Sequence, residues 1–297
     1  MSDLTIRRTE TDADLEAWNR VRRIVVPDEP SSTLEQMRSM AAEPDRVFLL
    51  AELDGETVGS GVASDSNLAD GFAMPRILPA HRRRGFGTAI LEALLDHHVA
   101  VGHRTVSSRS EDDAALAFAT RHGFVEIDRQ IEQVRTIAPK EPDPPSYPGV
   151  EFTTVAADPA LLERAYHAVA TQGYADMALV TGPAFVPLDE WLRDEATLPG
   201  GSIVAIADGR IVGWAGLNAW NDDDTRAENG LTVVDRAWRG KGLGTALKRR
   251  QLAWAAANGL RELVTWTQDA NAAMRQVNTS LGYVTRTISR TVVRNVP

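Results

Sequence analysis

The chain has 297 residues and carries 32 lysines and arginines against 41 aspartates and glutamates, a net charge of −9 that disfavours nucleic acid as a partner. Its length and its 43% hydrophobic content favour two domains, each with its own core. The absence of cysteine excludes disulfide scaffolds, thiolate metal sites and every mechanism that needs a cysteine nucleophile.

The first ten residues lack the basic and then apolar pattern of a secretory signal, and no apolar run approaches the roughly 20 residues that span a bilayer. We therefore expect a cytoplasmic protein without a membrane partner. In chain order, the first half predicts a helix over 12–26, a hairpin of strands 46–53 and 58–63, and a helix over 86–101. Asp54-Gly55 favours a type I′ turn in the hairpin, so a mixed α/β domain is predicted.

Five prolines lie between residues 138 and 149, where neither a helix nor a central strand can form. We interpret this segment as a stiff, extended linker. The prediction is therefore an N-terminal domain over 1–137, a linker over 138–149 and a C-terminal domain over 150–297.

The second half repeats the order of the elements. It predicts a helix over 158–170, a hairpin of strands 202–207 and 211–217, and a helix from Leu243 that stops at Asn258-Gly259. Asp158 is the expected N-cap of the first of these helices, with Pro159 at its first position. Asp208-Gly209 supplies a second type I′ turn.

Three pairs of short motifs recur in the same order, 154 to 159 residues apart. They are Asp54-Gly55 with Asp208-Gly209, a glycine loop that occurs twice, and Gly123-Phe124 with Gly282-Tyr283. The first glycine loop comprises Arg82, Arg83, Arg84, Gly85, Phe86, Gly87 and Thr88, and the second comprises Arg239, Gly240, Lys241, Gly242, Leu243, Gly244 and Thr245. Collinear matches at this period indicate that a whole domain is duplicated.

Each glycine loop follows a predicted strand and opens a predicted helix, an arrangement in which backbone N–H groups can bind a diphosphate. The second loop is not a P-loop, because Asp235 replaces the first glycine and Gly242 replaces the Ser/Thr. Neither loop is a dinucleotide fingerprint, because Ile90 and Leu247 replace the third glycine. The pattern that remains is Arg-x-x-Gly-x-Gly, present twice.

This doubled motif resembles that of the GNAT acyl-coenzyme A-dependent N-acyltransferases, and the resemblance covers nearly the whole chain as two tandem copies. It is most specific at 231–247 and 271–283. The family implies an α/β (α+β) fold in which each domain is a mixed, twisted sheet flanked by helices. It also implies acetyl-CoA as the cofactor, with the pyrophosphate held by the loop amides and the pantetheine arm paired with Thr232, Val233 and Val234.

Members of this family carry a catalytic carboxylate eleven residues before the first loop arginine, and Glu228 occupies that position in the second copy. A carboxylate there can take the proton of the substrate ammonium, directly or through water. The alternative is a solvated glutamate near 222–224, which are all aspartates. Gly71 occupies the position in the first copy, so the second copy is expected to be catalytic and the first mainly structural or coenzyme-binding.

The last helix of the family provides an Asn that contacts pantetheine and, seven residues on, a Tyr that protonates the departing thiolate. Asn271 fits the first role, but Asn278 stands at the Tyr position, and an amide has no proton to give at neutral pH. Either Asn278 hydrogen-bonds the sulfur while water donates the proton, or Tyr174 reaches the site. The first copy has Asp112 and Ala119 at these positions.

The function that the resemblance implies is transfer of an acetyl group from acetyl-CoA to the primary amine of a small molecule in a ternary complex. A backbone N–H near Val233 would stabilise the oxyanion. One alternative is a coenzyme A-sensing or interaction module without catalysis, and another is an acetyltransferase like the mycothiol-type synthases. No metal is expected, because the six histidines show no metal-ligand spacing. We expect a monomer or a homodimer.

Overall fold

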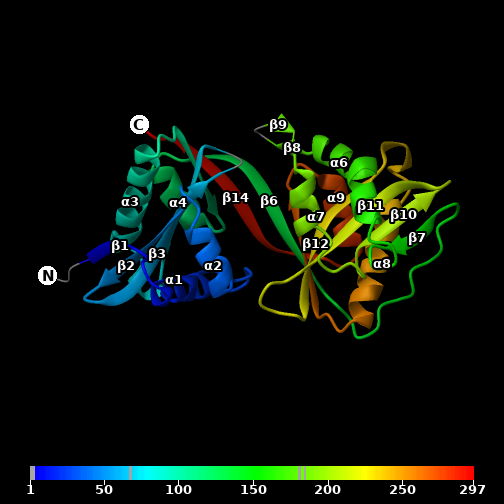
Figure 1. The fold of residues 1–297 in the computed structure, drawn as a ribbon, viewed down its shortest axis with the longest axis horizontal. Helices are drawn as coiled ribbons and strands as arrows, with labels where there is room; N and C mark the ends of the chain where they lie inside the picture. Colours follow the sequence, from blue (N-terminus) through cyan, green and yellow to red (C-terminus); the bar gives the residue numbers. More distant parts are fainter. Residues whose placement is uncertain (1–3, 67–68, 180–181, 184) are drawn as a thin grey trace. The chain divides into compact units, whose positions relative to one another are not determined.

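The computed structural model describes residues 4–66, 69–179, 182–183 and 185–297. The chain forms two compact units (Figure 1). The first unit ends at Asp128 and also takes in Ser289–Pro297, and the second comprises Arg129–Ile288. Each unit is a sheet with hydrophobic clusters and helices on both faces, which confirms the predicted fold class.

The sheet of the first unit has the order β1-β2-β3-β4-β5-β14. Neighbouring strands are antiparallel except for β4 and β5, which run parallel. Its elements are β1 (Leu4–Arg8), α1 (Asp12–Val25), α2 (Leu34–Ala41), β2 (Val47–Leu53), β3 (Glu56–Asp65), β4 (Gly71–Ile77), α3 (Phe86–Ala100), β5 (Thr105–Ser110), α4 (Asp113–Arg121) and the end of β14 (Val284–Asn295). A 3₁₀ turn at Pro79–His81 joins β4 to the first glycine loop.

Side chains of β2 alternate between two hydrophobic clusters, as expected for a strand with helices on both sides. Val47, Leu49 and Ala51 pack in the cluster that includes residues of α3. Phe48 and Leu50 pack in the cluster that includes residues of α1 and α2. The helix that follows the glycine loop and the two N-terminal helices therefore cover opposite faces of this sheet.

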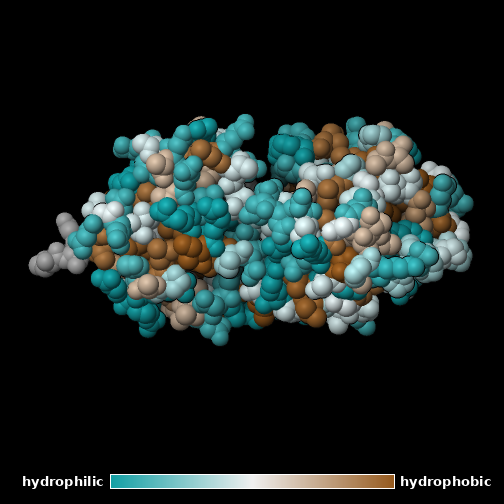
Figure 2. Space-filling view, turned by 90° about the horizontal axis from the view of Figure 1, so that it is seen from below, coloured by the Kyte–Doolittle hydropathy of each residue, from teal (hydrophilic) through white to brown (hydrophobic). Residues whose placement is uncertain are grey.

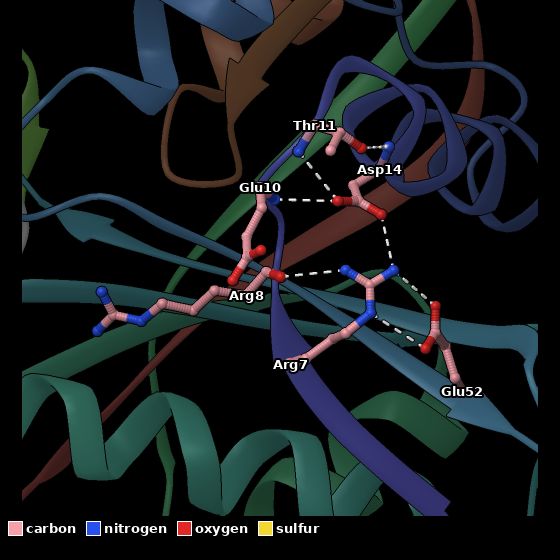
Figure 3. A network of polar contacts seen from close by, with 6 residues as sticks. All are labelled: Arg7, Arg8, Glu10, Thr11, Asp14 and Glu52. Atoms are coloured by element: carbon pink, nitrogen blue, oxygen red, sulfur yellow. Dashed lines mark hydrogen bonds and ion pairs between the residues drawn. The ribbon is translucent and has the colours of Figure 1, made fainter.

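A polar network fixes the start of α1 (Figure 3). The Thr11 side chain accepts a hydrogen bond from the backbone N–H of Asp14, and the Asp14 carboxylate accepts one from the N–H of Thr11, which forms a capping box. Arg7 of β1 donates to Asp14 at 2.7 Å and to Glu52 of β2 at 2.8 Å. The Arg7 guanidinium holds the pKa of Asp14 well below its usual value.

The sheet of the second unit has the order β6-β13-β12-β11-β10-β7, in which only β12 and β13 are parallel neighbours. Its elements are β6 (Val125–Thr136), β7 (Glu151–Thr154), α5 (Leu161–Ala165), a π-helical segment (Tyr166–Ala170), α6 (Thr171–Ala175), α7 (Leu188–Asp194), β10 (Ile203–Ala207), β11 (Arg210–Ala219), β12 (Arg226–Val234), α8 (Leu243–Ala257), β13 (Glu262–Gln268) and α9 (Ala272–Ser280). The strands β8 (Ala178–Leu179) and β9 (Gly182–Pro183) pair separately, and a 3₁₀ turn at Arg236–Trp238 precedes the second glycine loop.

The compact units differ from the sequence repeat, because each copy places its last strand in the sheet of the other. Residues 130–136 of β6 pair with β13 in the second unit, and residues 290–295 of β14 pair with β5 in the first. The proline-rich segment 138–149 contains no helix or strand and belongs to the second unit. There the Tyr147 hydroxyl donates to the carbonyl of Lys241 at 2.8 Å, so this segment contacts the second glycine loop.

The two predicted Asp-Gly hairpins are confirmed. Asp54 and Gly55 have φ values of 51° and 86°, and Asp208 and Gly209 have values of 48° and 71°. A positive φ at both central residues is the property of a type I′ turn. The two turns therefore adopt the conformation that their sequence predicts.

The predicted helix over 158–170 is wrong at both ends. Asp158 is not its N-cap: the helix begins at Leu161, and the Asp158 carboxylate accepts instead from the N–H of Ala160 at 3.1 Å in the turn before it. The helical path then continues through the π-helical segment to Ala175. A tight turn at Asp158 and Pro159 delays the start, because the N–H of Leu161 already bonds to the Asp158 carbonyl.

The second sheet also separates two clusters. Val204 and Trp214 pack with α5, the π-helical segment and α7. Ala205 and Ala215 pack on the other face, with Leu243 and Leu247 of α8. The face seen in Figure 2 is mostly hydrophilic, and its apolar side chains form separate patches. Within the described residues, none of the helices is both long and apolar enough to cross a membrane.

Candidate active site

The central feature of the second unit is the point at which β12 and β13 part. Their parallel pairing covers only Arg226 to Glu228 on β12 and Glu262 to Val264 on β13. Beyond this point β12 continues to Val234 and β13 to Gln268, so the two strands diverge. The opening leaves backbone amides of β12 without a strand partner on that side, and an extended molecule could pair with them.

The second glycine loop lies at the end of β12. Gly240 and Gly242 have φ values of 72° and 82°, a region in which side chains are strained, and Gly242 is the N-cap of α8. Arg239 Nε donates to the carbonyl of Val234 at 2.9 Å, and its guanidinium pairs with Asp176 after α6 at 2.6 Å. These contacts hold the N-terminus of α8 in line with β12, as a diphosphate site requires.

The first glycine loop has the same conformation. Gly85 is the N-cap of α3 with a φ of 87°, and Arg82 Nε donates to the carbonyl of Ile77 at 3.2 Å. Arg83, at the position of Gly240, has a φ of 64°. An arginine thus adopts a left-handed conformation that normally favours glycine, which shows that the fold imposes the loop geometry.

Glu228 is the last residue of β12 that pairs with β13, so its side chain lies at the apex of the opening. The side chain is partly buried rather than solvated. Burial raises the pKa of Glu228, and the negative charge of Glu132 raises it further. A raised pKa makes the carboxylate a stronger base, which suits the removal of a proton from an ammonium group.

Sequence reasoning missed a second carboxyl group, that of Glu195. It follows α7 and accepts hydrogen bonds from Trp214 Nε1 at 3.3 Å and from the N–H of Leu231 at 3.1 Å. A Cβ atom at Gly216 or Gly230 would come within 2.4 Å of its carboxylate oxygen. Two glycines inside neighbouring strands were the available signal, because they mark a close approach in a sheet.

Glu195 lies at a bulge in the ladder between β11 and β12. Leu217 pairs with Asn229 and Ala215 pairs with Thr232, so the register shifts by one residue between these pairs. A bulge redirects backbone groups and side chains locally, here next to the opening between β12 and β13. Burial raises the pKa of Glu195 to about 7 although hydrogen bonds from Trp214, Leu231 and Asn218 favour its ionised form.

The structure places Tyr174 next to β12, against the hydrophobic cluster that contains Val233. It lies on α6, where the neighbouring Gly173 approaches β12 so closely that a Cβ atom would be 2.8 Å from a methyl group of Val233. The Tyr174 ring packs edge-on against Trp191. Burial and the charge of Glu195 raise the pKa of Tyr174, so the hydroxyl keeps its proton at neutral pH.

The two asparagines of the α9 region have structural partners. Asn271 is the N-cap of α9, and its side chain accepts from the N–H of Met274 at 3.1 Å. Asn278 is fully buried, and its amide nitrogen donates to Gln133 at 3.0 Å and to Thr267 at 3.3 Å. The packing therefore brings Asn278 to the part of β13 that has diverged from β12.

Five buried side-chain atoms of the second unit have no hydrogen-bond partner within the described residues. They are Arg226 Nη2, Thr232 Oγ1, Lys248 Nζ, Arg275 Nε and Asn278 Oδ1. Such orphans are rare in folded proteins and suggest groups that a ligand completes. Thr232 lies on β12 and Asn278 contacts Thr267 of β13, so both unpartnered oxygens lie beside the two diverging strands.

Lys248 of α8 is a further residue that sequence reasoning missed. Its side chain is fully buried with Nζ 5.0 Å from the centre of the Tyr283 ring, and burial lowers its pKa to about 7. Tyr283 is itself buried, and its hydroxyl donates to Asn229 at 2.6 Å. A lysine next to buried Leu247 gives no clear signal in the sequence, because long side chains usually reach solvent from such positions.

The first unit diverges in the same way but lacks the carboxylate. Its β4 and β5 pair only at Gly71 with Val106 and at Phe72 with Ser107. The ladder between β3 and β4 continues without a register shift. A Cβ atom at Gly71 would lie 2.5 Å from the buried ring of His98, so His98 fills the space that a side chain would need.

A cavity of about 540 Å³ lies between these diverging strands and the first glycine loop. It is lined by Met74 and Arg76 of β4, by Arg82, Gly85 and Thr88 of the loop region, and by residues of β5 and α4. Asp112, at the position of Asn271, is the N-cap of α4, and Ala119, at the position of Asn278, is buried. The glycine loop and the opening between the strands are thus preserved in the first unit, while the residues that match Asn271 and Asn278 differ.

Comparison with known proteins agrees with this geometry. The model of the acetyltransferase (GNAT) family matches residues 13–124 and 171–283. A mycothiol acetyltransferase of Amycolatopsis mediterranei (strain U-32) is 29% identical over 250 residues, which cover 79% of this chain and 80% of the relative. A mycothiol acetyltransferase of Nocardia farcinica (strain IFM 10152) is 28% identical over 302 residues and 95% of both chains.

Solved structures share the fold. A GCN5-related N-acetyltransferase of Sphaerobacter thermophilus superposes with a TM-score of 0.76 at 18% identity, over 99% of this chain and 96% of the other. A tandem GNAT protein of the clavulanic acid biosynthesis pathway gives a TM-score of 0.75 at 18% identity over 99% of both chains. The two family matches fall on the two copies that the sequence repeat defines. The chain therefore belongs to the GNAT acetyltransferase family, as a tandem N-acetyltransferase that uses acetyl-CoA.

Proposed function

We propose that the second unit transfers the acetyl group to the primary amine of a small molecule. The observation that carries this proposal is the position of Glu228 at the apex of the opening between β12 and β13, with the second glycine loop at the other end of β12. A base and a diphosphate site at opposite ends of one strand suit a long thioester that lies along it. The first unit has no carboxylate at the matching position.

Acetyl-CoA, when bound, supplies a thioester carbonyl that an amine can attack. Glu228 takes the proton of the ammonium group and thereby frees the lone pair for attack. A backbone N–H near Val233 would hold the thioester carbonyl oxygen and stabilise negative charge on it. Tyr174, which packs against the hydrophobic cluster that contains Val233 of β12, would donate the proton that the departing sulfur needs.

The cofactor-binding residues follow from the same arrangement. Backbone amides of the second glycine loop, 239–245, hold the pyrophosphate, and Thr232, Val233 and Val234 of β12 hold the pantetheine arm. Asn271 and Asn278 would line the side of the opening that faces β12, next to β13. The first glycine loop, 82–88, forms a second coenzyme site, which its matching backbone supports.

Glu228→Gln tests the proposed base, because glutamine has nearly the same shape but cannot accept the ammonium proton. Turnover should fall by about 10²- to 10⁴-fold while the affinity for acetyl-CoA stays the same. The wild-type rate should rise with pH up to the raised pKa of Glu228, and this acid limb should disappear in the variant. Thiol release and calorimetric titration measure the two quantities.

Asp223→Asn is a matched control, since Asp223 lies in the nearby acidic loop and its carboxylate bonds to Thr225. It should leave turnover within about twofold of wild type. Unchanged turnover in Glu228→Gln at every pH would remove Glu228 from the mechanism.

A narrower candidate is acetylation in the formation of mycothiol, which the names of the curated relatives favour. The test is turnover with the unacetylated precursor of mycothiol against a panel of other small primary amines. A value of kcat/KM for the precursor at least 100-fold above the panel would support this acceptor. Similar values across the panel would remove it and leave the acetyltransferase proposal intact.

A further inference from the structure

The cavity of the first unit contains charged side chains that coenzyme binding at the glycine loop does not explain. Away from the loop it is lined by Arg76 of β4, Arg109 of β5, Glu111 after β5 and Glu29 after α1. In the second unit, Val233 stands at the position of Arg76. The charged group is therefore particular to the first unit.

Arg76 is the central residue of this group. Its guanidinium lies 5.6 Å from the centre of the Trp18 ring, and its Nη1 atom is buried with no hydrogen-bond partner in the described part of the chain. Burial lowers the pKa of Arg76 to about 10, so it stays charged at neutral pH. A buried guanidinium without a full set of acceptors is costly, and a cavity beside it gives an acceptor room to bind.

The neighbouring carboxyl groups do not neutralise Arg76 fully. Glu29 forms an ion pair with Arg22 at 2.7 Å. Burial, reinforced by the charge of Glu29, raises the pKa of Glu111 to about 7, so Glu111 is partly protonated at neutral pH. The cavity is lined by five arginines and three carboxylates, and the carboxylate of Asp112 already caps α4. The excess charge is positive.

We propose that Arg76 binds an anionic group, a carboxylate or a phosphate, of a ligand in the cavity of the first unit. The guanidinium offers a planar pair of N–H donors that matches such a group. The anion has two possible sources: the acyl end of a coenzyme A thioester that carries a terminal carboxylate, or a separate small anion. This site is independent of the acetyl transfer proposed for the second unit.

Calorimetric titration of the full-length chain tests the proposal with four ligands: acetyl-CoA, succinyl-CoA, succinate and inorganic phosphate. Each is compared between wild type and Arg76→Met, whose side chain has similar length but no charge. The second unit is the same in both proteins, so a difference reports on the first. We expect Arg76→Met to lower the affinity for succinyl-CoA, succinate or phosphate, at least one of them, by about 10- to 100-fold. The affinity for acetyl-CoA should stay unchanged.

The pattern of affinities across the four ligands identifies the source of the anion. A loss confined to succinyl-CoA assigns the anion to the acyl end, and a loss that includes succinate or phosphate assigns it to a separate molecule. Arg76→Lys, which keeps the charge without the fork, should retain part of the affinity. Equal affinities of wild type and Arg76→Met for all four ligands would overturn the proposal.

Thermal unfolding without ligand separates binding from a structural role. Arg76→Met should have a Tm at least as high as wild type, because it removes a buried and incompletely paired charge. A large fall in Tm, together with no Arg76-dependent anion binding, would assign Arg76 to the packing of Trp18 and contradict the proposal.

Discussion

The two glycine loops have nearly the same backbone, whereas the strands that lead into them differ at almost every position that chemistry requires. Gly85 and Gly242 are both N-caps with a left-handed backbone conformation. Arg82 and Arg239 each donate a hydrogen bond to the carbonyl of the last residue of the preceding strand. The second unit adds a carboxylate at the apex of its opening. Duplication has thus preserved the conformation of the glycine loop in both units and a carboxylate at the opening in one.

The strand before the loop carries the difference. In the second unit β12 has a bulge beside Glu195 and a polar Thr232. In the first unit β4 pairs with β3 without a shift, and Pro75 stands at the position of Thr232, where it removes one backbone donor. A cavity alone therefore does not identify the catalytic copy, since the cavity described above belongs to the first unit.

Bulky residues at the two N-caps should separate the copies most strongly. A Cβ atom at Gly242 or Gly85 would meet open space, which is where the pyrophosphate would lie. Gly242→Trp should abolish acetyl transfer, whereas Gly85→Trp should leave it intact. Tryptophan at a positive φ costs about 1–2 kcal/mol in both, so the two variants are matched in strain.

Thiol release in the presence of an accepted amine measures both variants, with circular dichroism as the control for folding. An inactive Gly85→Trp together with an active Gly242→Trp would assign catalysis to the first unit and remove Glu228 from its role.

Glu195→Gln should change stability in a pH-dependent way, because burial raises the pKa of Glu195. The folded chain holds this proton up to a pKa of about 7, whereas the unfolded chain releases it near 4.5, so stability falls as pH rises between these values. The variant should therefore be more stable than wild type by roughly 3 kcal/mol at pH 8 and equal to it at pH 4. Urea unfolding at the two pH values measures this, and a constant difference would contradict the burial of Glu195.

Gly71→Ala probes why the first unit has no carboxylate. The new methyl group would meet the His98 ring at 2.5 Å, so the variant should lose about 1–3 kcal/mol of stability. Glu228→Ala, at the matching position, should lose less because that site already holds a side chain. Equal losses in denaturant unfolding would show that His98 does not block the position.

Arg83→Gly should have the smallest effect. Glycine adopts a φ of 64° without strain, so the variant should gain up to about 1 kcal/mol in the folded state. Gly240→Ala, the reverse change in the second loop, should lose a similar amount. A rise in Tm for Arg83→Gly and a fall in Tm for Gly240→Ala would support one loop geometry in both copies. A fall in Tm for both variants would contradict it.

The duplication, both hairpins and the loop that opens each long helix could be predicted, because they depend on local rules. Asp-Gly turns need positive φ at two adjacent residues, and glycine loops recur with their flanking helices. Glu228 was found by its spacing from Arg239. Each of the sequence motifs that show these features is contained in a dozen residues or fewer.

The features that sequence reasoning missed depend on distant contacts. Glu195 meets Leu231 across 36 residues, and Lys248 is buried against Tyr283. The exchange of last strands joins segments that lie more than 120 residues apart in the chain, such as residues 290–295 with β5. No local pattern specifies such pairings, because an edge strand can pair with any free edge of suitable register.

The most direct test of the central claim is a crystal structure of the protein exposed first to acetyl-CoA and then to an accepted amine. We predict intact thioester in the first unit, between β4 and β5, and free coenzyme A thiol in the second, between β12 and β13. Loss of the acetyl group from the first unit, with intact thioester in the second, would contradict this assignment of catalysis.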